Sequence, residues 1–154
     1  MKLEGFQSAV LAAMISSALL LGAFAFQYIG DLPPCKMCIW QRWPHGIAIF
    51  LGLLLFGLPV RPVASLGFLV VLVGAGIAFF HAGVEQLWWE GPSTCTSGSV
   101  AGMSTEDLLD QIMNAPLVRC DEIPWSLFGL SMAAWNGVIS LVAAGLWLRA
   151  ALRT

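Results

Sequence analysis

The sequence has very few charged residues. Only 10% of its 154 residues are Asp, Glu, Lys or Arg, whereas 58% are hydrophobic, and the mean hydropathy is +0.83. A soluble domain carries about 25% charged residues, so this composition excludes an ordinary soluble globular protein. The few basic residues form no cluster of the kind that binds nucleic acid. We therefore expect a membrane protein that does not act on DNA or RNA.

Long hydrophobic runs take up most of the chain. A helix needs roughly 20 residues to cross the hydrocarbon core of a bilayer. Four stretches qualify, the second only just: about residues 8–28, 43–60, 63–82 and 127–148. They predict an all-α membrane protein in which residues 1–154 form a single domain, a bundle of four transmembrane helices. The connecting loops are expected at about residues 29–42 and 83–126.

The longer loop contains a helix-start pattern, Ser104-Thr-Glu-Asp107. Apolar side chains follow it at helical spacing. We therefore expect this loop to carry short helices that lie in the membrane interface.

The distribution of charge predicts the orientation of the bundle. With four spans, both termini and the turn at Arg61 lie on one side, and this side carries one acid, Glu4. The positive-inside rule places such a side in the cytoplasm, by a margin of four basic residues to three. Tryptophans flank the opposite ends of the spans, as expected at an interface: Trp40, Trp43, Trp88, Trp89 and Trp125. We expect a bacterial inner-membrane protein with cytoplasmic termini and periplasmic loops.

All four cysteines fall in the predicted periplasmic loops. Cys35 and Cys38 are separated by two residues, and such a pair closes into a small disulfide that opens easily. Cys95 and Cys120 lie in the long loop, and the segment around Cys95 is rich in Gly, Ser and Thr, which predicts an exposed sulfur. An oxidising space allows both pairs to cycle. This arrangement indicates electron transfer through thiols.

Arg42 and His45 follow Cys38 by four and seven residues, on the same helix face. A helix N-terminus and a nearby cation both favour the thiolate form of a cysteine. A thiolate with a guanidinium one turn deeper suits the reduction of a quinone, to which Arg42 would donate hydrogen bonds. The alternative is that Arg42 only extends to the lipid headgroups.

Other interpretations of these residues stay open on spacing alone. Four cysteines could bind structural zinc, and Cys95 with Cys120 could be a purely structural disulfide. Neither a thioredoxin domain nor covalent haem fits, because no βαβ pattern surrounds the C-x-x-C and Ile39 follows it instead of His. His45 and His81 could bind a haem b, but we expect His45 to be a polar tip at the interface.

The segment Pro34-Cys35-Lys-Met-Cys38-Ile-Trp-Gln-Arg42 resembles the C-x-x-C-x-x-[QE]-R signature of the disulfide bond formation protein B (DsbB) family. His81, the Cys95/Cys120 loop and the stretch from Cys120 to Met132 also resemble this family in order and spacing. Glu85 is a departure, because the family often has glutamine four residues after the histidine.

The resemblance implies a membrane thiol:quinone oxidoreductase that generates disulfides de novo. It implies that Cys95 and Cys120 accept electrons from a periplasmic thioredoxin-fold oxidase of the DsbA type. Cys35 and Cys38 then pass the electrons to ubiquinone or menaquinone, with Arg42 as a quinone ligand. His81 is the other expected quinone contact, with Glu85 beside it, and no metal is expected. The expected partners are the oxidase, membrane lipid and the quinone pool.

Two alternatives come from other classes of protein. A vitamin K epoxide reductase-like enzyme also combines a helical bundle, a C-x-x-C and quinone chemistry. In that family, however, the C-x-x-C lies late, in the last span, whereas here it precedes the second. The other alternative is a non-enzymatic membrane subunit whose disulfides are structural.

Overall fold

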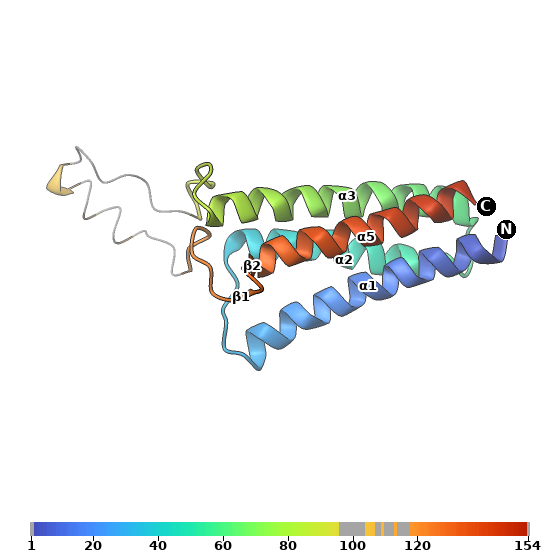
Figure 1. Cartoon of the computed structure of the whole chain (residues 1–154), viewed down its shortest axis with the longest axis horizontal. Helices are drawn as coiled ribbons and strands as arrows, with labels where there is room; N and C mark the ends of the chain where they lie inside the picture. The colour runs from blue at the N-terminus through green and yellow to red at the C-terminus, as the bar shows by residue number, and fades with distance from the viewer. Residues whose placement is uncertain (1, 96–103, 107–108, 110–112, 114–117, 154) are drawn as a thin grey trace.

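The computed structural model describes residues 2–95, 104–106, 109, 113 and 118–153. Within them the chain is mostly helical (Figure 1). The elements, in chain order, are α1 (Lys2–Tyr28), α2 (Lys36–Leu54), α3 (Val60–Glu85), β1 (Ser126–Leu127), β2 (Leu130–Ser131) and α5 (Met132–Leu152). The short helix predicted from Ser104 onward lies largely outside the described residues.

The four helices form an elongated bundle. α2 and α5 each pack against both α1 and α3, whereas α1 and α3 lie diagonally and share few contacts. Both termini lie at one end, where the guanidinium of Arg153 donates to the carboxylate of Glu4 across 3.0 Å (Figure 1). At the opposite end α1 leans away from the other helices. The two termini therefore lie at the same end of the bundle, as a bundle of four spans requires.

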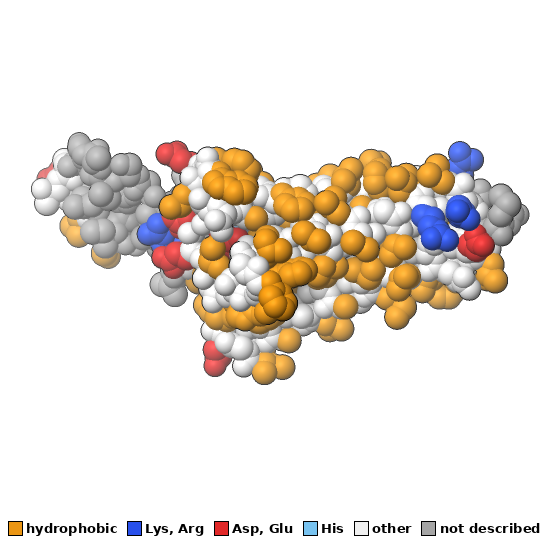
Figure 2. All heavy atoms as spheres, in the orientation of Figure 1, with side chains coloured by type: hydrophobic (Ala, Val, Ile, Leu, Met, Phe, Trp, Pro, Cys, Tyr) orange, Lys and Arg blue, Asp and Glu red, His pale blue; other side chains and the backbone are white. Residues whose placement is uncertain are grey.

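Three helices are long and apolar enough to cross a membrane: Leu3–Tyr28, Val60–Glu85 and Met132–Leu152. Hydrophobic side chains cover the flank of the bundle, and the charged side chains gather near its two ends (Figure 2). Among the described residues, α2 is not one of these candidate spans. It is long enough, but polar side chains near its start lower its hydropathy. The predicted four spans are thus supported for α1, α3 and α5.

The helix that covers most of the second predicted span, α2, begins before that span. α2 begins at Lys36, seven residues before the expected start at residue 43, because the sulfur of Cys35 accepts a hydrogen bond from the backbone N–H of Cys38. A side-chain acceptor at the N-cap satisfies one of the free amides of the first helical turn. The helix ends at Leu54, and a short turn leads to Pro59 at the start of α3. Both cysteines of the C-x-x-C therefore sit at the N-terminus of α2.

The last span also begins later than predicted, at Met132 instead of residue 127. The preceding residues form a short two-stranded antiparallel hairpin, β1–β2, where a helix was expected, although the described residues are mostly helical. Phe128 and Gly129 both have positive φ, at 52° and 78°. Two consecutive residues of this kind build a tight hairpin turn and exclude a helix. Ser131 then caps α5 by accepting the N–H of Ala134.

Small residues allow the helices to approach closely. The pairs that the sequence spaces four apart are all buried: Gly74 with Ala78, Ala133 with Gly137, and Ser140 with Ala144. Such residues are typical of helix interfaces in membranes. Near the terminal end of the bundle, the fully buried indole of Trp147 packs over Gly67 of α3. The core here is made mostly of alanine and glycine around one large ring.

The contact between Gly67 and Trp147 generates a prediction about stability. A Cβ at position 67 would lie 2.5 Å from the nearest atom of the indole, which is enclosed and has no room to shift. Gly67→Ala should therefore destabilise the protein by about 1–3 kcal/mol through overpacking. Gly76→Ala is the matched control, because no described atom lies within 4 Å of its Cβ position. Thermal unfolding in detergent, followed by circular dichroism, should separate the two variants, and equal melting temperatures would contradict the packing argument.

Candidate active site

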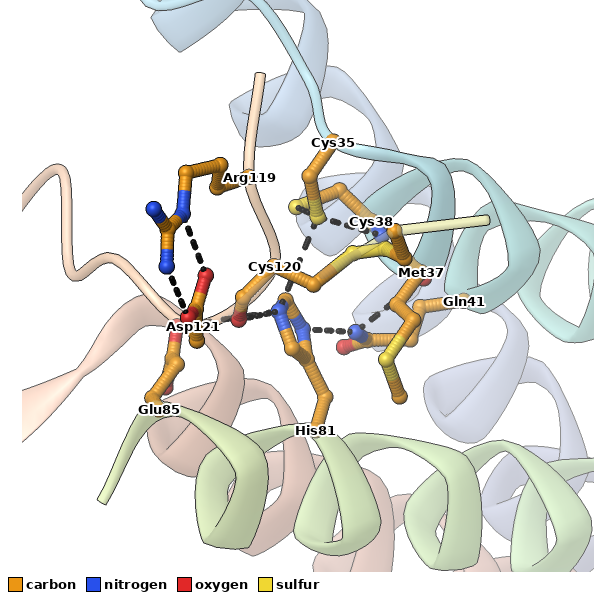
Figure 3. Close-up of a disulfide and its surroundings, with 10 residues drawn as sticks. Cys35, Met37, Cys38, Gln41, His81, Glu85, Arg119, Cys120 and Asp121 are labelled. Carbon is orange, nitrogen blue, oxygen red and sulfur yellow. Dashed lines mark hydrogen bonds and ion pairs between the residues drawn. A yellow bond between two sulfur atoms is a disulfide. The ribbon is translucent and has the colours of Figure 1, made fainter. Parts of the chain in front are cut away.

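The sulfurs of Cys35, Cys95 and Cys120 lie within 4.8 Å of one another. Cys95 and Cys120 form a disulfide with their Cα atoms 5.4 Å apart, and Cys35 and Cys38 are free thiols (Figure 3). The backbone N–H of Cys120 also donates to the carbonyl of Cys95. The fold thus brings cysteines from the start of α2 and from the long loop into one cluster.

Cys35 and Cys38 are placed to react with each other. Their sulfur atoms are 2.6 Å apart, and the amide of Cys38 points at the sulfur of Cys35. The pKa of Cys35 is raised well above its ordinary value, first because Cys38 hydrogen-bonds to it and second because it is buried. A thiol with a raised pKa is a poor nucleophile at neutral pH. Of the two sulfurs, the structure therefore favours Cys38 as the thiolate.

The disulfide between Cys95 and Cys120 is buried. Both side chains have 0% exposure and pack with Cys35, Met37 and Val84. The prediction that Cys95 is exposed was wrong, since composition describes the segment but not what the sulfur packs against. The same disulfide removes two of the four thiolates that the zinc alternative requires.

His81, near the end of α3, lies at the junction of the two cysteine pairs (Figure 3). Its Nε2 is 3.6 Å from the sulfur of Cys35 and 3.2 Å from the carbonyl oxygen of Cys120. Its Nδ1 is 2.8 Å from the side-chain nitrogen of Gln41. Both ring nitrogens therefore have partners, and the histidine contacts the thiols directly.

A chain of polar side chains extends from His81 into the bundle. Asn136 of α5 donates to the side-chain oxygen of Gln41 across 2.7 Å, and its own oxygen lies 2.9 Å from Nε2 of His45. His45 is only 3% exposed, so the expectation of a polar tip at the interface was wrong. Two amide side chains link the imidazoles of His45 and His81, an arrangement unlike a shared haem site.

Sequence reasoning gave Gln41 and Asn136 no role of their own. Gln41 stands within the quoted motif, and Asn136 is a polar residue inside an apolar run. A polar side chain inside a membrane helix costs free energy unless it has a partner or a function. The position of Asn136 in an apolar run could therefore have identified it as a candidate site residue.

Glu85 is buried beside the site. Its carboxylate accepts from the hydroxyl of Ser131, and one oxygen lies 3.9 Å from Nε2 of His81. The expected approach of Glu85 to His81 thus occurs, but Ser131 is the hydrogen-bond partner. Because Ser131 also caps α5, this side chain connects the ends of α3 and α5.

Arg42 contacts α1 instead of extending to the headgroups. Its guanidinium donates to the side-chain oxygen of Gln27 across 2.6 Å and to the carbonyl of Ala23 across 3.4 Å. It also lies over the ring of Phe24, 4.9 Å from the centroid, which is cation–π geometry. Its Nε is buried and has no hydrogen-bond partner among the described residues.

A cavity of about 570 Å³ opens beside the thiols, where α1 leans away from α2 and α5. Cys35, Cys38, Arg42, His81 and Glu85 contribute to its wall, and most of the remaining lining is apolar. This volume lies in the range of small-molecule sites, and its apolar wall with a few convergent polar groups is typical of them. Every sequence-predicted site residue lies in the thiol cluster or on this cavity.

A charged pair brackets Cys120 on its outer side. The guanidinium of Arg119 donates to the carboxylate of Asp121 across 2.9 Å, and this contact lowers the pKa of Asp121 (Figure 3). Arg119 itself is well exposed. The approach to the loop disulfide therefore carries a fixed pair of opposite charges.

The sequence comparisons agree with this arrangement. Residues 7–150 match the family described as "Disulfide bond formation protein DsbB". The chain belongs to the DsbB family. Several relatives carry the name "Disulfide bond formation protein B". The protein from Methylococcus capsulatus is 33% identical, over 82% of this chain and 81% of its own length. The proteins from Paracidovorax citrulli and Shewanella sp. (strain MR-4) are 30% and 35% identical, over 88% and 77% of this chain and 81% and 70% of their own lengths. No solved structure gives a significant match.

DsbB-family membership establishes the class of the protein. Together with the apolar helices, it makes the chain a membrane oxidoreductase that generates disulfides. The free thiols at the start of α2 and the loop disulfide are consistent with this activity. The alternative of a non-enzymatic subunit and that of a vitamin K epoxide reductase-like enzyme are therefore set aside.

Proposed function

We propose that this DsbB-family protein is a thiol:quinone oxidoreductase that reoxidises a periplasmic thioredoxin-fold oxidase of the DsbA type. The observation that carries the proposal is the position of Cys35. Its sulfur lies beside the Cys95–Cys120 disulfide on one side and beside Cys38 and the cavity on the other. Electrons that enter at the loop disulfide can therefore reach the cavity without a large movement of the sulfurs.

The proposed topology has four membrane-spanning helices in a single domain, residues 1–154, with both termini in the cytoplasm and both loops in the periplasm of a bacterial inner membrane. α2 is the fourth span. It has 19 residues, and at about 1.5 Å per residue it is about 28 Å long, close to the thickness of a bilayer core. Its polar residues Gln41 and His45 are buried against other helices, which removes the main cost of placing them in lipid.

The first exchange takes place at the loop disulfide. The partner's thiolate attacks the sulfur of Cys95, a mixed disulfide forms, and Cys120 leaves as a thiolate. Cys120 then attacks Cys35 of an oxidised Cys35–Cys38 pair, and Cys38 leaves as a thiolate. The partner's second thiol attacks its own mixed disulfide, which releases the oxidised partner and the thiolate of Cys95.

The second exchange resets the loop. Cys95 attacks Cys120, which re-forms the loop disulfide and frees Cys35. Two electrons have then moved from the partner dithiol to Cys35 and Cys38, and the partner's disulfide is the product. Cys38 lines the cavity, and the raised pKa of Cys35 makes Cys35 the poorer nucleophile of the two, so we assign Cys38 as the electron donor to the quinone.

The residues around the cavity fit a quinone. The apolar part of the wall suits a ring with a prenyl tail, and the guanidinium of Arg42 supplies donors for a carbonyl oxygen. His81 and Glu85 line the same cavity and can hold a proton near it. A bound quinone, ubiquinone or menaquinone, would accept two electrons and two protons. The two cysteine pairs, Arg42 and His81 are thus the residues we assign to the reaction.

The decisive experiment measures quinone reduction by the purified protein with a reduced DsbA-type oxidase as the electron donor. The wild type should reduce a soluble quinone analogue and oxidise the partner in a one-to-one ratio. Cys38→Ser should abolish quinone reduction, because the sulfur at the cavity is lost. Partner oxidation without quinone reduction by the wild type would refute the quinone as acceptor.

A second prediction distinguishes Cys95 from Cys120. If the partner attacks Cys95, removal of the resolving thiol should trap the complex. Cys120→Ser should therefore accumulate a mixed disulfide with the partner, visible on a non-reducing gel, and Cys95→Ser should not. Trapping by Cys95→Ser alone would mean that the loop operates in the opposite direction.

A third prediction concerns Arg42. Loss of one charged hydrogen bond costs about 1.5–3 kcal/mol, so Arg42→Ala should raise the quinone KM roughly 10- to 150-fold. Arg42→Lys keeps the charge without the planar fork of donors and should fall between the wild type and alanine. Exchange between the two cysteine pairs should be nearly unchanged in both variants.

Gln27→Ala is the control for Arg42. It removes the contact that ties the guanidinium to α1 but leaves the guanidinium at the cavity. Its KM should rise much less than that of Arg42→Ala. If both variants raise KM equally, Arg42 acts by holding α1 in place and not as a quinone ligand.

A further inference from the structure

The amide of Gln41 has a fixed orientation. Its side-chain nitrogen lies 3.3 Å from the backbone carbonyl of Met37 and 2.8 Å from Nδ1 of His81. A carbonyl oxygen accepts hydrogen bonds and never donates them. The group that faces Met37 must therefore be the NH₂ of Gln41 (Figure 3 shows the contacts of Gln41 with Met37 and His81). The amide oxygen faces the opposite way, toward Asn136.

The orientation of Gln41 determines the rest of the chain. Its oxygen requires a donor, which is the NH₂ of Asn136 at 2.7 Å. The oxygen of Asn136 then faces Nε2 of His45 at 2.9 Å, and this nitrogen must carry a proton. The hydroxyl of Ser140 donates to the same oxygen across 3.4 Å. The carbonyl of Met37 and the NH₂ of Asn136 thus together set the direction of the hydrogen bonds in a buried chain that joins α2, α3 and α5.

The same reasoning assigns the protons of His81. The NH₂ of Gln41 donates to Nδ1, so Nδ1 is unprotonated and neutral His81 carries its proton on Nε2. This N–H faces the carbonyl oxygen of Cys120 and the sulfur of Cys35. Both are acceptors, whereas a bare Nε2 would place a lone pair against the carbonyl.

We propose that Asn136 and Gln41 are positioning residues that hold His81 in the Nε2–H tautomer, so that this N–H stabilises the Cys35 thiolate during exchange between the two cysteine pairs. When Cys95 attacks Cys120, the Cys120–Cys35 bond breaks and its electron pair goes to Cys35. The Nε2–H donates to that thiolate, and no proton is transferred. The proposal rests on the thiol relay of the proposed function but is independent of the quinone.

The tautomer can be measured directly. The chain contains two histidines, so ¹⁵N-histidine labelling gives two imidazoles, and His81→Asn assigns them by removing one. In the wild type, His81 should show a protonated Nε2 and an unprotonated Nδ1, and so should His45. A proton on Nδ1 of His81 in the wild type would overturn the proposal without the need for any other variant.

Asn136→Asp reverses the direction of the chain with almost no change in shape. A carboxylate cannot donate to Gln41 but accepts from its NH₂, so Gln41 should turn, give up its longer 3.3 Å bond to Met37 and present its oxygen to His81, which then needs a proton on Nδ1. We expect the ¹⁵N spectrum to show this tautomer and the exchange between the cysteine pairs to slow by about 10-fold or more, the loss of one charge-assisted hydrogen bond. Gln41→Glu replaces the NH₂ that donates to Nδ1 of His81 with a carboxylate oxygen. This variant should therefore also show a proton on Nδ1 of His81.

The exchange is measured in quinone-free protein. Reduction starts with the reduced DsbA-type oxidase, and alkylation followed by mass spectrometry reports when Cys35 and Cys38 become reduced. Ser17→Ala is the matched control, because its hydroxyl bonds only to the carbonyl of Ala13 within α1, and it should match the wild type. An unchanged tautomer and rate in Asn136→Asp would overturn the proposal. Failure of the quinone assay alone would leave it standing, since neither measurement contains quinone.

Discussion

The imidazole of His81 holds together three parts of the molecule that are far apart in the sequence. It contacts Gln41 and Cys35 at the start of α2, the carbonyl of Cys120 in the long loop, and, at a longer distance, Glu85 of its own helix. A buried polar group without partners costs about 1–3 kcal/mol. All of these segments must therefore be in place together, which makes the assembly of the thiol cluster cooperative with the folding of the bundle.

The bundle is packed differently at its two ends, and the difference creates the site. At the terminal end, alanines and glycines surround Trp147 and bring the helices close together. At the cysteine end, α1 leans outward and is tied to α2 by Arg42 and Gln27. The cavity lies where close packing stops. The same bundle thus has a closely packed end around Trp147 and a cavity at the cysteine end.

The sequence predicted the features that depend on composition and local spacing. Three of the four helices follow from apolar runs, and the C-x-x-C motif with Arg42 indicated where the thiol chemistry lies. The apolar run alone placed the second span later than the start of α2, because a cysteine serves as the N-cap of this helix, an uncommon capping residue. The β1–β2 hairpin was missed because its apolar residues continue the run of α5, and Phe128 adopts a positive φ.

The remaining features could not be predicted because they are tertiary. The partner of His45 is Asn136, 91 residues away, and no local pattern connects them. The burial of Cys95 depends on residues of α2 and α3. Glycine and serine content describes a segment but does not determine whether its one sulfur is covered. Long-range contacts of this kind decide the chemistry of the site.

The burial of the Cys95–Cys120 disulfide has a consequence for selectivity. Disulfide exchange requires the attacking thiolate to reach the sulfur directly. Free cysteine or glutathione in the surrounding medium meets a covered sulfur and a charged pair at Cys120, whereas a docked protein can use its binding energy to uncover the bond. Burial of the bond therefore favours exchange with a docked protein over exchange with a small thiol.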